Sequence, residues 1–538
     1  MSLWQLLFKK PFRQEFQTTF LLLGLGVLLA ILSATATIYI AWCIITFIEK
    51  HEYSIVYHAL FGSIIAGISL GMSNYITHKA ELKFSDGLRQ KVLLHILRLP
   101  NNHLSQVNEH KFRQLICDDI ANLHYLIAHL PNEFIVFIVT PSLAISLLIK
   151  TAGVNMLVVL LPAVLASCYY LLIVPKVVKR DGALRMQTMQ DVISSVENYT
   201  KGIRLYRSLS GYKGQSKLLD GFYEATRKFG DEMTSWVIKV VVFAAIATAL
   251  LQVVPTYAIV YAFTGSEDIQ VVLASLIFGV AAIHPISRLA HGLDYIYLAK
   301  NSAKNLDNFL STPQLPKGKT NKILIDNIKL LNLSIKTNEK FIIENLNYVF
   351  HKGEVTMISG TSGSGKSTLL HIIAGSAPKE YGQILYGKTP IENISEQAKY
   401  RHILHIPQGI DMPFMTVREL LQLTNSDISD VELGHALNRV ELATKIDATL
   451  PSLSGGERQR ALLALVCLTK ADVILLDECM SALDMLAAKA FMQTLKDFAQ
   501  QYQKIIILVS HEPWMAELSD KHLNLGQVQS QKQGAINE

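Results

Sequence analysis

The chain has 538 residues, too many for a single hydrophobic core, so two or three domains are expected. Half of the residues are hydrophobic and 17% are charged, compared with about a quarter in soluble domains, and the apolar excess lies before residue 300. The net charge of +6 is spread along the chain and does not favour a nucleic-acid partner, and the five scattered cysteines predict neither a disulfide framework nor a zinc site.

Six long apolar stretches precede residue 290 and predict six transmembrane helices. A helix rises about 1.5 Å per residue and must cross about 30 Å of hydrocarbon, so about twenty residues suffice. The stretches lack the period-two alternation of barrel strands, and the third is interrupted by Asn132 and Glu133. They run over Phe20–Ile48, Tyr53–Ile76, Ile127–Ile149, Gly153–Pro175, Trp236–Phe263 and Ile269–Ile286.

Basic residues in the loops predict the orientation of these helices. Seven Lys or Arg lie between the second and third stretches, from Lys79 to Arg113, and eleven lie between the fourth and fifth, from Lys176 to Lys228. The opposite loops hold only Lys50 and Lys150. The excess of basic residues marks the cytoplasmic side, so we expect the N-terminus, both long loops and the C-terminal half in the cytoplasm.

The first apolar stretch follows basic residues, as the core of a secretory signal peptide does. Its length is about twice that of a signal-peptide core, which favours a retained membrane anchor.

The six spans contain no Asp, Glu, Lys or Arg other than Glu133 and Lys239, which lie near span ends. A relay of buried charges, as used by proton-coupled carriers, is therefore not indicated. Polar side chains within the spans leave two alternatives open: they line a polar path, or they hydrogen-bond a neighbouring helix. These side chains are Ser33, Thr35, Ser69, Ser73, Asn74 and Gln252.

The composition changes after the segment PQLPKGK, Pro313–Lys319, which indicates a linker. From about Ile323, short β-rich runs alternate with helical stretches, as in a soluble α/β domain. We expect a transmembrane domain over residues 1–310, a linker over 311–322 and an α/β domain over 323–538.

A glycine-rich run in the second half fits the phosphate-binding pattern G-x-x-x-x-G-K-[ST]. It follows the apolar run Val355–Ser359 and precedes Leu369 and Leu370, so it predicts strand, loop and helix, with the helix N-terminus favouring an anion. Lys366 would reach the β- and γ-phosphates of a nucleotide, and Ser367 would ligate Mg²⁺. The run comprises Gly360, Thr361, Ser362, Gly363, Ser364, Gly365, Lys366, Ser367 and Thr368.

Five further segments follow the loop in a fixed order. Two carboxylates, Asp477 and Glu478, end an apolar strand, which suits one metal ion and one general base in phosphoryl transfer. The segments are Gln408 after Ile403–Ile406, LSGGERQR at Leu453–Arg460, VILLDE at Val473–Glu478, SALD at Ser481–Asp484, and His511 after Ile505–Ser510.

These motifs, in this order, resemble those of ATP-binding cassette (ABC) ATPases and cover essentially the whole second half. With six apolar stretches before them, the chain resembles half of an ABC transporter with the exporter-type (type IV) fold. The resemblance implies an all-α membrane domain of six transmembrane helices with long cytoplasmic extensions, followed by an α/β P-loop ATPase domain. It also implies a coupling helix at each cytoplasmic turn, near Asn108–Gln114 and Arg204–Gly214.

The resemblance also implies a role for each matching residue. Asp477 and Gln408 would join Ser367 in holding Mg²⁺. Glu478 would act as the general base on the attacking water, and His511 would contact the γ-phosphate, with Lys366 as a further catalytic residue. ATP and Mg²⁺ are the implied cofactors.

Dimerisation follows from the same resemblance. In the family, the residues that match Ser454, Gly455 and Gly456 cap the γ-phosphate on the other subunit, and the one that matches Asp484 pairs across the dimer. One cassette with six spans is half a transporter, so the implied partner is a second half, in a homodimer or a heterodimer.

Two features depart from the usual pattern. No tyrosine stands in LSIKT, Leu333–Thr337, where an aromatic residue usually stacks on adenine, and Phe341, Tyr348 or Phe350 would have to substitute. The segment before LSGGERQR reads DATLPSL, where exporters commonly carry a TEVGE-like sequence. These departures resemble the branch that handles siderophores and modified peptides.

The expected function is ATP-driven transport of an amphipathic small molecule across a bacterial inner membrane, with export favoured. A siderophore, a peptide or a lipid-like compound fits the description, and membrane lipid surrounds the spans. A siderophore importer of the same fold is the first alternative. An ATP-gated regulator or channel subunit would not need the catalytic residues, and a soluble ABC ATPase acting on DNA or ribosomes would not need the spans.

Overall fold

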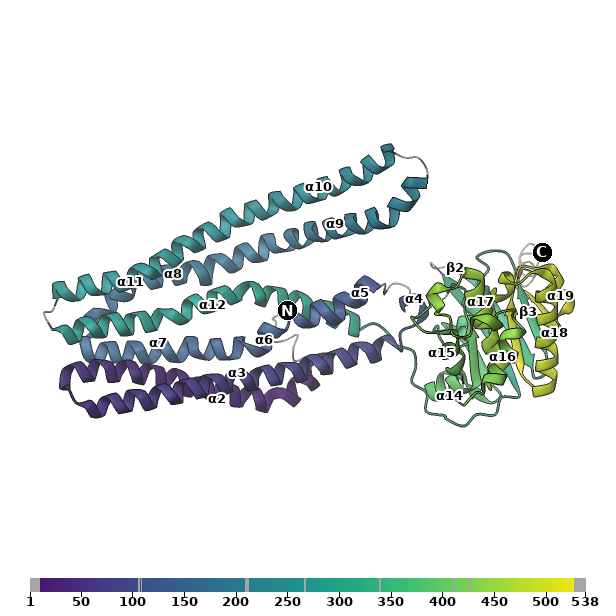
Figure 1. Cartoon of the computed structure of the whole chain (residues 1–538), viewed down its shortest axis with the longest axis horizontal. Coiled ribbons are helices and arrows are strands. Elements are labelled where there is room, and N and C mark those ends of the chain that lie inside the picture. The colour runs from purple at the N-terminus through teal and green to yellow at the C-terminus, as the bar shows by residue number, and fades with distance from the viewer. Residues whose placement is uncertain are drawn as a thin grey trace. The chain divides into compact units, whose positions relative to one another are not determined.

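The computed structural model describes residues 10–104, 107, 109–208, 212–265, 268–337, 340–409, 412–424 and 427–526. The chain divides into two compact units, coloured from purple to yellow along the chain in Figure 1. The helical unit comprises Met1–His95 and Glu109–Thr312, and the α/β unit comprises Ile96–Asn108 and Pro313–Glu538. The second unit thus includes a short segment that lies inside the expected first domain.

The helical unit consists of long helices, several of which are broken into consecutive pieces. α7 packs against α2 and α12, α9 packs against α10, and α11 packs against α8 and α12 (Figure 1). The α-helical pieces are α2 Lys10–Lys50, α3 Tyr53–Ile96, α5 Glu109–Arg113, α6 His124–Ala128, α7 Leu130–Ala152, α8 Leu161–Cys168, α9 Val174–Ser208, α10 Tyr212–Trp236, α11 Phe243–Gly265 and α12 Ile269–Leu310. The intervening pieces are η1 Gln114–Asp119, η2 Val154–Leu160, η3 Tyr169–Ile173 and η4 Val237–Val242.

Three helical stretches of the described residues are long and apolar enough to cross a membrane: Phe12–Lys50, Tyr53–Ile96 and Lys111–Ala152. Two shorter apolar helices, Val253–Thr264 and Ile269–Ile283, fall in the fifth and sixth predicted stretches. The fourth predicted stretch is divided among η2, α8, η3 and the start of α9. The number of six spans remains a prediction.

Serine hydroxyls join α2 to α3. Ser33 donates to the carbonyl oxygen of Ala66 at 2.9 Å, and Ser73 donates to that of Gly26 at 2.7 Å. Ser73 also accepts a hydrogen bond from Asn132 of α7 at 2.9 Å. For Ser33 and Ser73, the structure therefore favours the alternative in which the hydroxyl bonds a neighbouring helix.

Two sheets form the α/β unit. A parallel sheet has the strand order β6-β7-β8-β3-β9, and an antiparallel sheet has the order β2-β1-β4-β5. β7 and β8 are buried at every position, as expected for central strands of a parallel sheet covered on both faces. The strands are β1 Asn327–Thr337, β2 Lys340–His351, β3 Val355–Ser359, β4 Tyr381–Tyr386, β5 Thr389–Pro390, β6 Ile403–Ile406, β7 Val473–Asp477, β8 Ile505–Val509 and β9 Lys521–Asn524.

Helices cover the parallel sheet and create two apolar cores. One core joins the sheet to α15–α18, and the other joins it to α13 and the antiparallel sheet. The helices are α13 Lys366–Ile373, α14 Glu396–His402, α15 Val417–Gln422, α16 Asp430–Asn438, α17 Gly455–Leu468, α18 Met485–Tyr502 and α19 Pro513–Leu518, with short 3₁₀ turns η5 Ile391–Asn393, η6 Ala443–Lys445, η7 Leu450–Ser452 and η8 Cys479–Ala482.

The segment Ile96–Asn108 packs within the α/β unit through α4, Asn101–Leu104. The Asn101 amide nitrogen lies 2.8 Å from His371 Nδ1, and the Arg98 guanidinium lies 2.9 Å from the Glu396 carboxylate. This docked turn precedes the range 108–114 where we expected the first coupling helix. The second expected turn includes residues 209–211, which lie outside the described residues.

Candidate nucleotide-binding site

The phosphate-binding loop lies between β3 and α13, as the sequence predicts. Gly365 has φ +91°, and a Cβ atom there would lie 2.9 Å from Ile342 Cδ1, so only glycine fits without strain. A Cβ atom on Gly360 would lie 2.6 Å from Ser364 Oγ. The loop tip, Thr361–Gly363, is exposed, so its backbone N–H groups are open to an incoming anion.

Lys366 is buried, although it is the first residue of α13. Its Nζ donates to the carbonyl oxygens of Gly360 and Thr361, both at 3.0 Å, so the side chain curls back over the loop. Ser364 Oγ is buried and has no hydrogen-bond partner among the described residues. A positive charge beside an unpaired hydroxyl in a loop of open N–H groups fits the phosphates of a nucleotide.

Asp477 ends β7 with 2% of its surface exposed, facing the start of α13. It accepts a hydrogen bond from Ser367, while its Oδ1 atom is buried without a partner among the described residues. Burial raises the pKa of Asp477 above its ordinary value, and the Ser367 hydroxyl opposes the shift. An unpaired carboxylate oxygen next to a hydroxyl is an oxygen donor set that fits Mg²⁺.

Glu478 is held between Gln408 and His511. The Gln408 side-chain nitrogen donates to one carboxylate oxygen at 2.6 Å, and His511 Nε2 lies 3.0 Å from the other. The three residues meet because β6, β7 and β8 are adjacent in the sheet and each of these side chains follows its strand. The backbone of Glu478 has φ +50°, an uncommon conformation that turns the chain sharply after β7.

The segments LSGGERQR and SALD each contain the residue that caps the N-terminus of the next helix. Ser454 caps α17, and its backbone N–H donates to the Glu457 carboxylate at 2.8 Å, which lowers the pKa of Glu457. Gly456 follows Gly455 in the first turn of α17. Asp484 caps α18 and accepts from the Ala487 N–H at 2.8 Å.

Two cavities border these groups. Gly455 lines a cavity of about 180 Å³ together with Gln408 and Asp477. Glu478 and His511 line another of about 250 Å³. The structure therefore gathers Lys366, Ser367, Gln408, Asp477, Glu478 and His511 at one edge of the parallel sheet, whereas Ser454 and Asp484 stand at helix starts where their side chains are used for capping.

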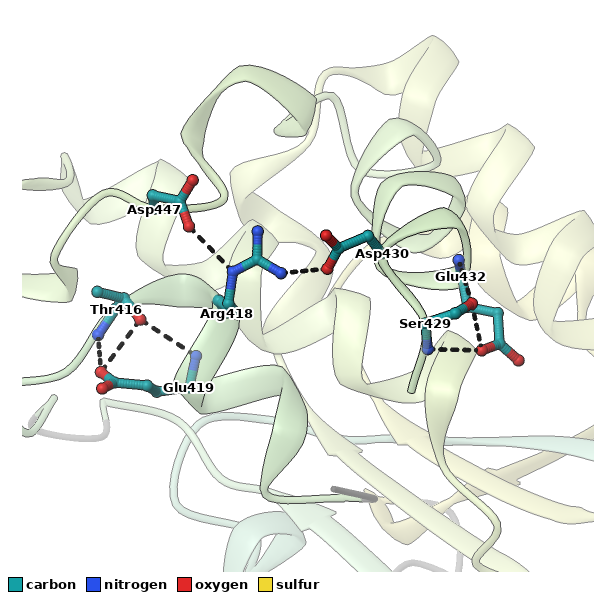
Figure 2. A network of polar contacts seen from close by, with 7 residues as sticks. All are labelled: Thr416, Arg418, Glu419, Ser429, Asp430, Glu432 and Asp447. Carbon is teal, nitrogen blue, oxygen red and sulfur yellow. Dashed lines mark hydrogen bonds and ion pairs between the residues drawn. The ribbon is translucent and has the colours of Figure 1, made fainter. Parts of the chain in front are cut away.

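The segment DATLPSL, Asp447–Leu453, lies beside α15 and leads into α17, and α15, α16 and α17 share one pattern of N-terminal capping. Figure 2 shows Thr416 and Glu419 capping α15, and Ser429 and Glu432 capping α16, with the same reciprocal pattern as in α17. Between them, Arg418 pairs with Asp447 of DATLPSL at 3.0 Å and with Asp430 (Figure 2). No sequence motif indicates this bridge, which ties the segment before LSGGERQR to α15 and α16.

The aromatic residues near the loop differ in exposure. Phe350 is fully buried, and Tyr348 is half-buried, with its ring 4.8 Å from that of Phe350, so neither offers an open face. Phe341 is 40% exposed, and its ring lies 5.8 Å from that of Tyr381, which is 51% exposed. The sequence did not indicate Tyr381, because β1 separates β2 from β4 and sheet order is not visible in the sequence.

Comparison with known proteins identifies the family to which the α/β unit is similar. The family described as ABC transporter matches residues 343–481. The cytochrome c biogenesis ATP-binding export protein CcmA of Vibrio cholerae is 30% identical over 195 residues, which cover 35% of this chain and 93% of that protein. The glutathione/L-cysteine transport system ATP-binding/permease protein CydC of Haemophilus influenzae is 30% identical over 213 residues, 37% of this chain and 36% of that protein.

A solved structure resembles the fold of nearly the whole chain. A bacterial Atm1-family ABC exporter with ATP bound matches with a TM-score of 0.72 at 15% identity, covering 96% of this chain and 94% of that one. The expected fold class, a helical membrane-type domain followed by an α/β ATPase domain, is confirmed. The chain belongs to the ABC transporter family, and it is an ATPase coupled to transport across a membrane.

Proposed function

We propose that this chain is one half of a dimeric exporter that moves an amphipathic small molecule out of the cytoplasm across a bacterial inner membrane. The observation that carries the proposal is the placement of Glu478 between Gln408 and His511, beside the Asp477–Ser367 pair. A base, a metal-binding carboxylate and a phosphate loop at one sheet edge are the parts that phosphoryl transfer to water requires.

Each side chain at this edge has a separate task. Glu478 accepts the proton of the attacking water, and His511 contacts the γ-phosphate. Lys366 pairs with the β- and γ-phosphates. Ser367, Asp477 and Gln408 hold Mg²⁺, which neutralises charge developing on the phosphates when bound. Because Gln408 donates to Glu478 through its nitrogen, its amide oxygen stays available for the cation.

The second subunit completes the site. Ser454, Gly455 and Gly456 begin α17, and a helix N-terminus attracts an anion, so these residues cap the γ-phosphate bound by the partner. Asp484 pairs across the same dimer. Binding of ATP between two such cassettes stabilises the closed dimer, and hydrolysis releases it. A homodimer has two complete sites, and a heterodimer with a similar half is equally compatible.

The membrane orientation rests on the basic loops. Lys and Arg gather in the two long loops, so these loops and the α/β unit lie in the cytoplasm. The relatives reported above align with 35–37% of the chain, about the length of the α/β unit, so their cargoes do not identify the cargo here. A siderophore, a peptide and a lipid-like compound are the three cargo classes proposed, and a siderophore importer is the alternative for direction.

The substitution Glu478→Gln tests the base. We expect ATP binding to persist and turnover to fall by about 10²–10⁴-fold, because the amide cannot accept the proton. Glu517→Gln, an exposed residue on α19, is the matched control and should leave turnover unchanged. Unaltered ATPase activity in Glu478→Gln would remove Glu478 from the role of base.

Transport into inside-out vesicles tests direction and cargo. Siderophores, peptides and lipids are offered on the side that carries the ATPase, with Glu478→Gln as the inactive reference. ATP-dependent accumulation inside supports export, and ATP-dependent loss from preloaded vesicles supports import. A chain that stays monomeric with nucleotide while still moving solute contradicts the dimer.

A further inference from the structure

Three histidines of the helical unit meet at a point that the nucleotide chemistry does not use. His78 lies on α3, His124 begins α6, and His129 stands between α6 and α7 (elements labelled in Figure 1). One ring nitrogen from each lies within 4.8 Å of the others. The ring centroids are 4.9–5.3 Å apart, and all three side chains are half-buried.

A break in the helix brings two of these rings together. In an unbroken α-helix, residues five positions apart project about 140° away from each other. Here α6 ends at Ala128 and α7 begins at Leu130, and His129 between them has φ −111° and ψ −48°, a distorted helical conformation whose N–H still bonds the Tyr125 carbonyl oxygen. Across this distortion the centroids of the His124 and His129 rings lie 5.3 Å apart.

Two of the rings are oriented by hydrogen bonds through Nδ1. His78 Nδ1 donates to the carbonyl oxygen of Asn74 at 2.8 Å, and His124 Nδ1 lies 3.3 Å from the Glu81 carboxylate. Glu81 is itself buried and accepts from Ser85 at 2.6 Å. Both rings thus keep Nε2 for a ligand, and metal-binding histidines characteristically donate their other N–H to a carbonyl or a carboxylate.

We propose that His78, His124 and His129 bind one divalent transition-metal ion, with zinc the best match. Neutral imidazoles suit zinc, copper and nickel, whereas magnesium and calcium prefer oxygen donors. At a zinc–nitrogen distance of 2.0–2.1 Å, tetrahedral ligands lie about 3.3 Å apart, so the nitrogens need to approach by at most about 1.5 Å from their separations here. Ring rotations supply this, and the fourth position stays open to water or another donor.

The site goes beyond the proposed function, because neither ATP nor the cargo takes part in it. The three rings can also pack in edge contact without a metal, and Glu81 would then hydrogen-bond His124 in the same way. The observation that favours the metal site is the convergence of one ring nitrogen from each histidine within 4.8 Å, with two of the rings held through their other nitrogen. Binding there would fix α3 to the break between α6 and α7, since the ligands come from both sides.

A metal titration of the full chain tests the proposal. The protein is purified without a histidine tag, in a Cys117→Ser background that removes an exposed thiol, and Zn²⁺ is titrated against a competing chelator. We expect one ion per chain, and losses of affinity of about 10-fold or more in His78→Ala and in His129→Ala, with about 10–100-fold in Glu81→Gln. His58→Ala, an exposed histidine on the same helix, is the control and should change nothing.

Two outcomes overturn the site. One is a wild-type chain that binds no Zn²⁺, and the other is binding that His78→Ala and His129→Ala leave unchanged. If the alanine variants fail to fold, as judged by lost ATP binding, the wild-type chain decides the question with Co²⁺. Visible d–d bands of a four-coordinate, nitrogen-bound ion support the site, and their absence contradicts it.

Discussion

In the α/β unit, the polar groups proposed for ATP chemistry follow directly on buried strands, whereas in the helical unit polar groups meet from helices far apart in the sequence. Asp477 and Glu478 come after the fully buried β7, and His511 follows the fully buried β8 by two positions. Ser73, by contrast, bonds Gly26 and Asn132, which are 47 and 59 positions away. In the α/β unit, short sequence segments therefore identify the functional residues, whereas in the helical unit the polar contacts depend on how distant helices pack.

Exposure differs between the units in the same way. Large apolar side chains of α2 and α3 lie open, including Leu21 at 84% and Phe61 at 65% exposed. The apolar strands of the α/β unit are buried between helices and a second sheet. A lipid environment accepts exposed apolar side chains without penalty, so the helical unit constrains the identity of each such residue far less.

After Glu478, the largest effect is expected at Lys366, where one side chain serves the whole site. Lys366→Ala removes the ammonium that lies over the loop, so ATP hydrolysis should fall on the order of 10²–10³-fold and nucleotide binding should weaken. The measurement is steady-state ATPase activity with a nucleotide-binding titration. Lys388→Ala, an exposed lysine of the same unit, is the control, and a similar loss there would mean that charge alone matters.

A pair of identical substitutions measures the difference in packing. Leu475→Ala in β7, where the side chain is fully buried, should cost roughly 2–5 kcal/mol of unfolding free energy because it leaves a cavity. Leu28→Ala in α2, where the side chain is 63% exposed, should cost less than about 0.5 kcal/mol. Denaturant titration of each unit within the full chain gives both values. Equal costs would show that Leu28 is covered in the assembled protein.

Acid should act on the α/β unit through His405. Burial, with the nearby His371, lowers the pKa of His405 to about 3, so the folded state holds this ring neutral. Stability from this group is complete above pH 6.5 and falls with decreasing pH towards 3, by up to about 1.4 kcal/mol per pH unit. The protein binds fewer protons folded than unfolded over this range, which fixes the sign.

The test for His405 compares urea unfolding at pH 7, 6 and 5. Of the four tryptophans of the chain, Trp514 alone lies in the α/β unit, so its fluorescence reports the unfolding of that unit, and His405→Phe removes the titrating ring. We expect a shallower loss of stability with acid in the variant. An unchanged slope would assign the acid sensitivity to other groups.

The sequence allowed more of the α/β unit than of the helical unit to be predicted. Lys366, Gln408, Asp477, Glu478 and His511 were each identified from the residues beside them. Their mutual contacts were not visible, because the strand order that places β6, β7 and β8 side by side depends on long-range pairing. Tyr381 and the Arg418–Asp447 bridge were missed for the same reason.

In the helical unit, hydropathy indicated where helices lie but not how they are broken or joined. Gly153 has φ +87° and separates α7 from η2 within a region that composition presents as two apolar stretches. No glycine or proline stands at position 129 to predict the interruption there, although Pro131 follows in the first turn of α7. Of the polar residues in the spans, the sequence could not separate those that bond a neighbouring helix from the rest.

Ser73 gives the smallest and most discriminating test of that separation. Its hydroxyl is fully buried and links α2, α3 and α7, yet hydrogen bonds between membrane helices contribute on average only about 0.6 kcal/mol and at most about 1.7 kcal/mol. Ser73→Ala should therefore lower the stability of the helical unit by that amount. A double-mutant cycle with Asn132→Ala isolates the contact from the loss of packing.

Ser63→Ala, on the same helix, is the control. It removes an exposed hydroxyl that donates to Ala59 of its own helix and should cost nothing measurable. If the two serines cost the same, the three helices are held by apolar packing, and the polar contacts of the helical unit carry no more weight than its exposed leucines.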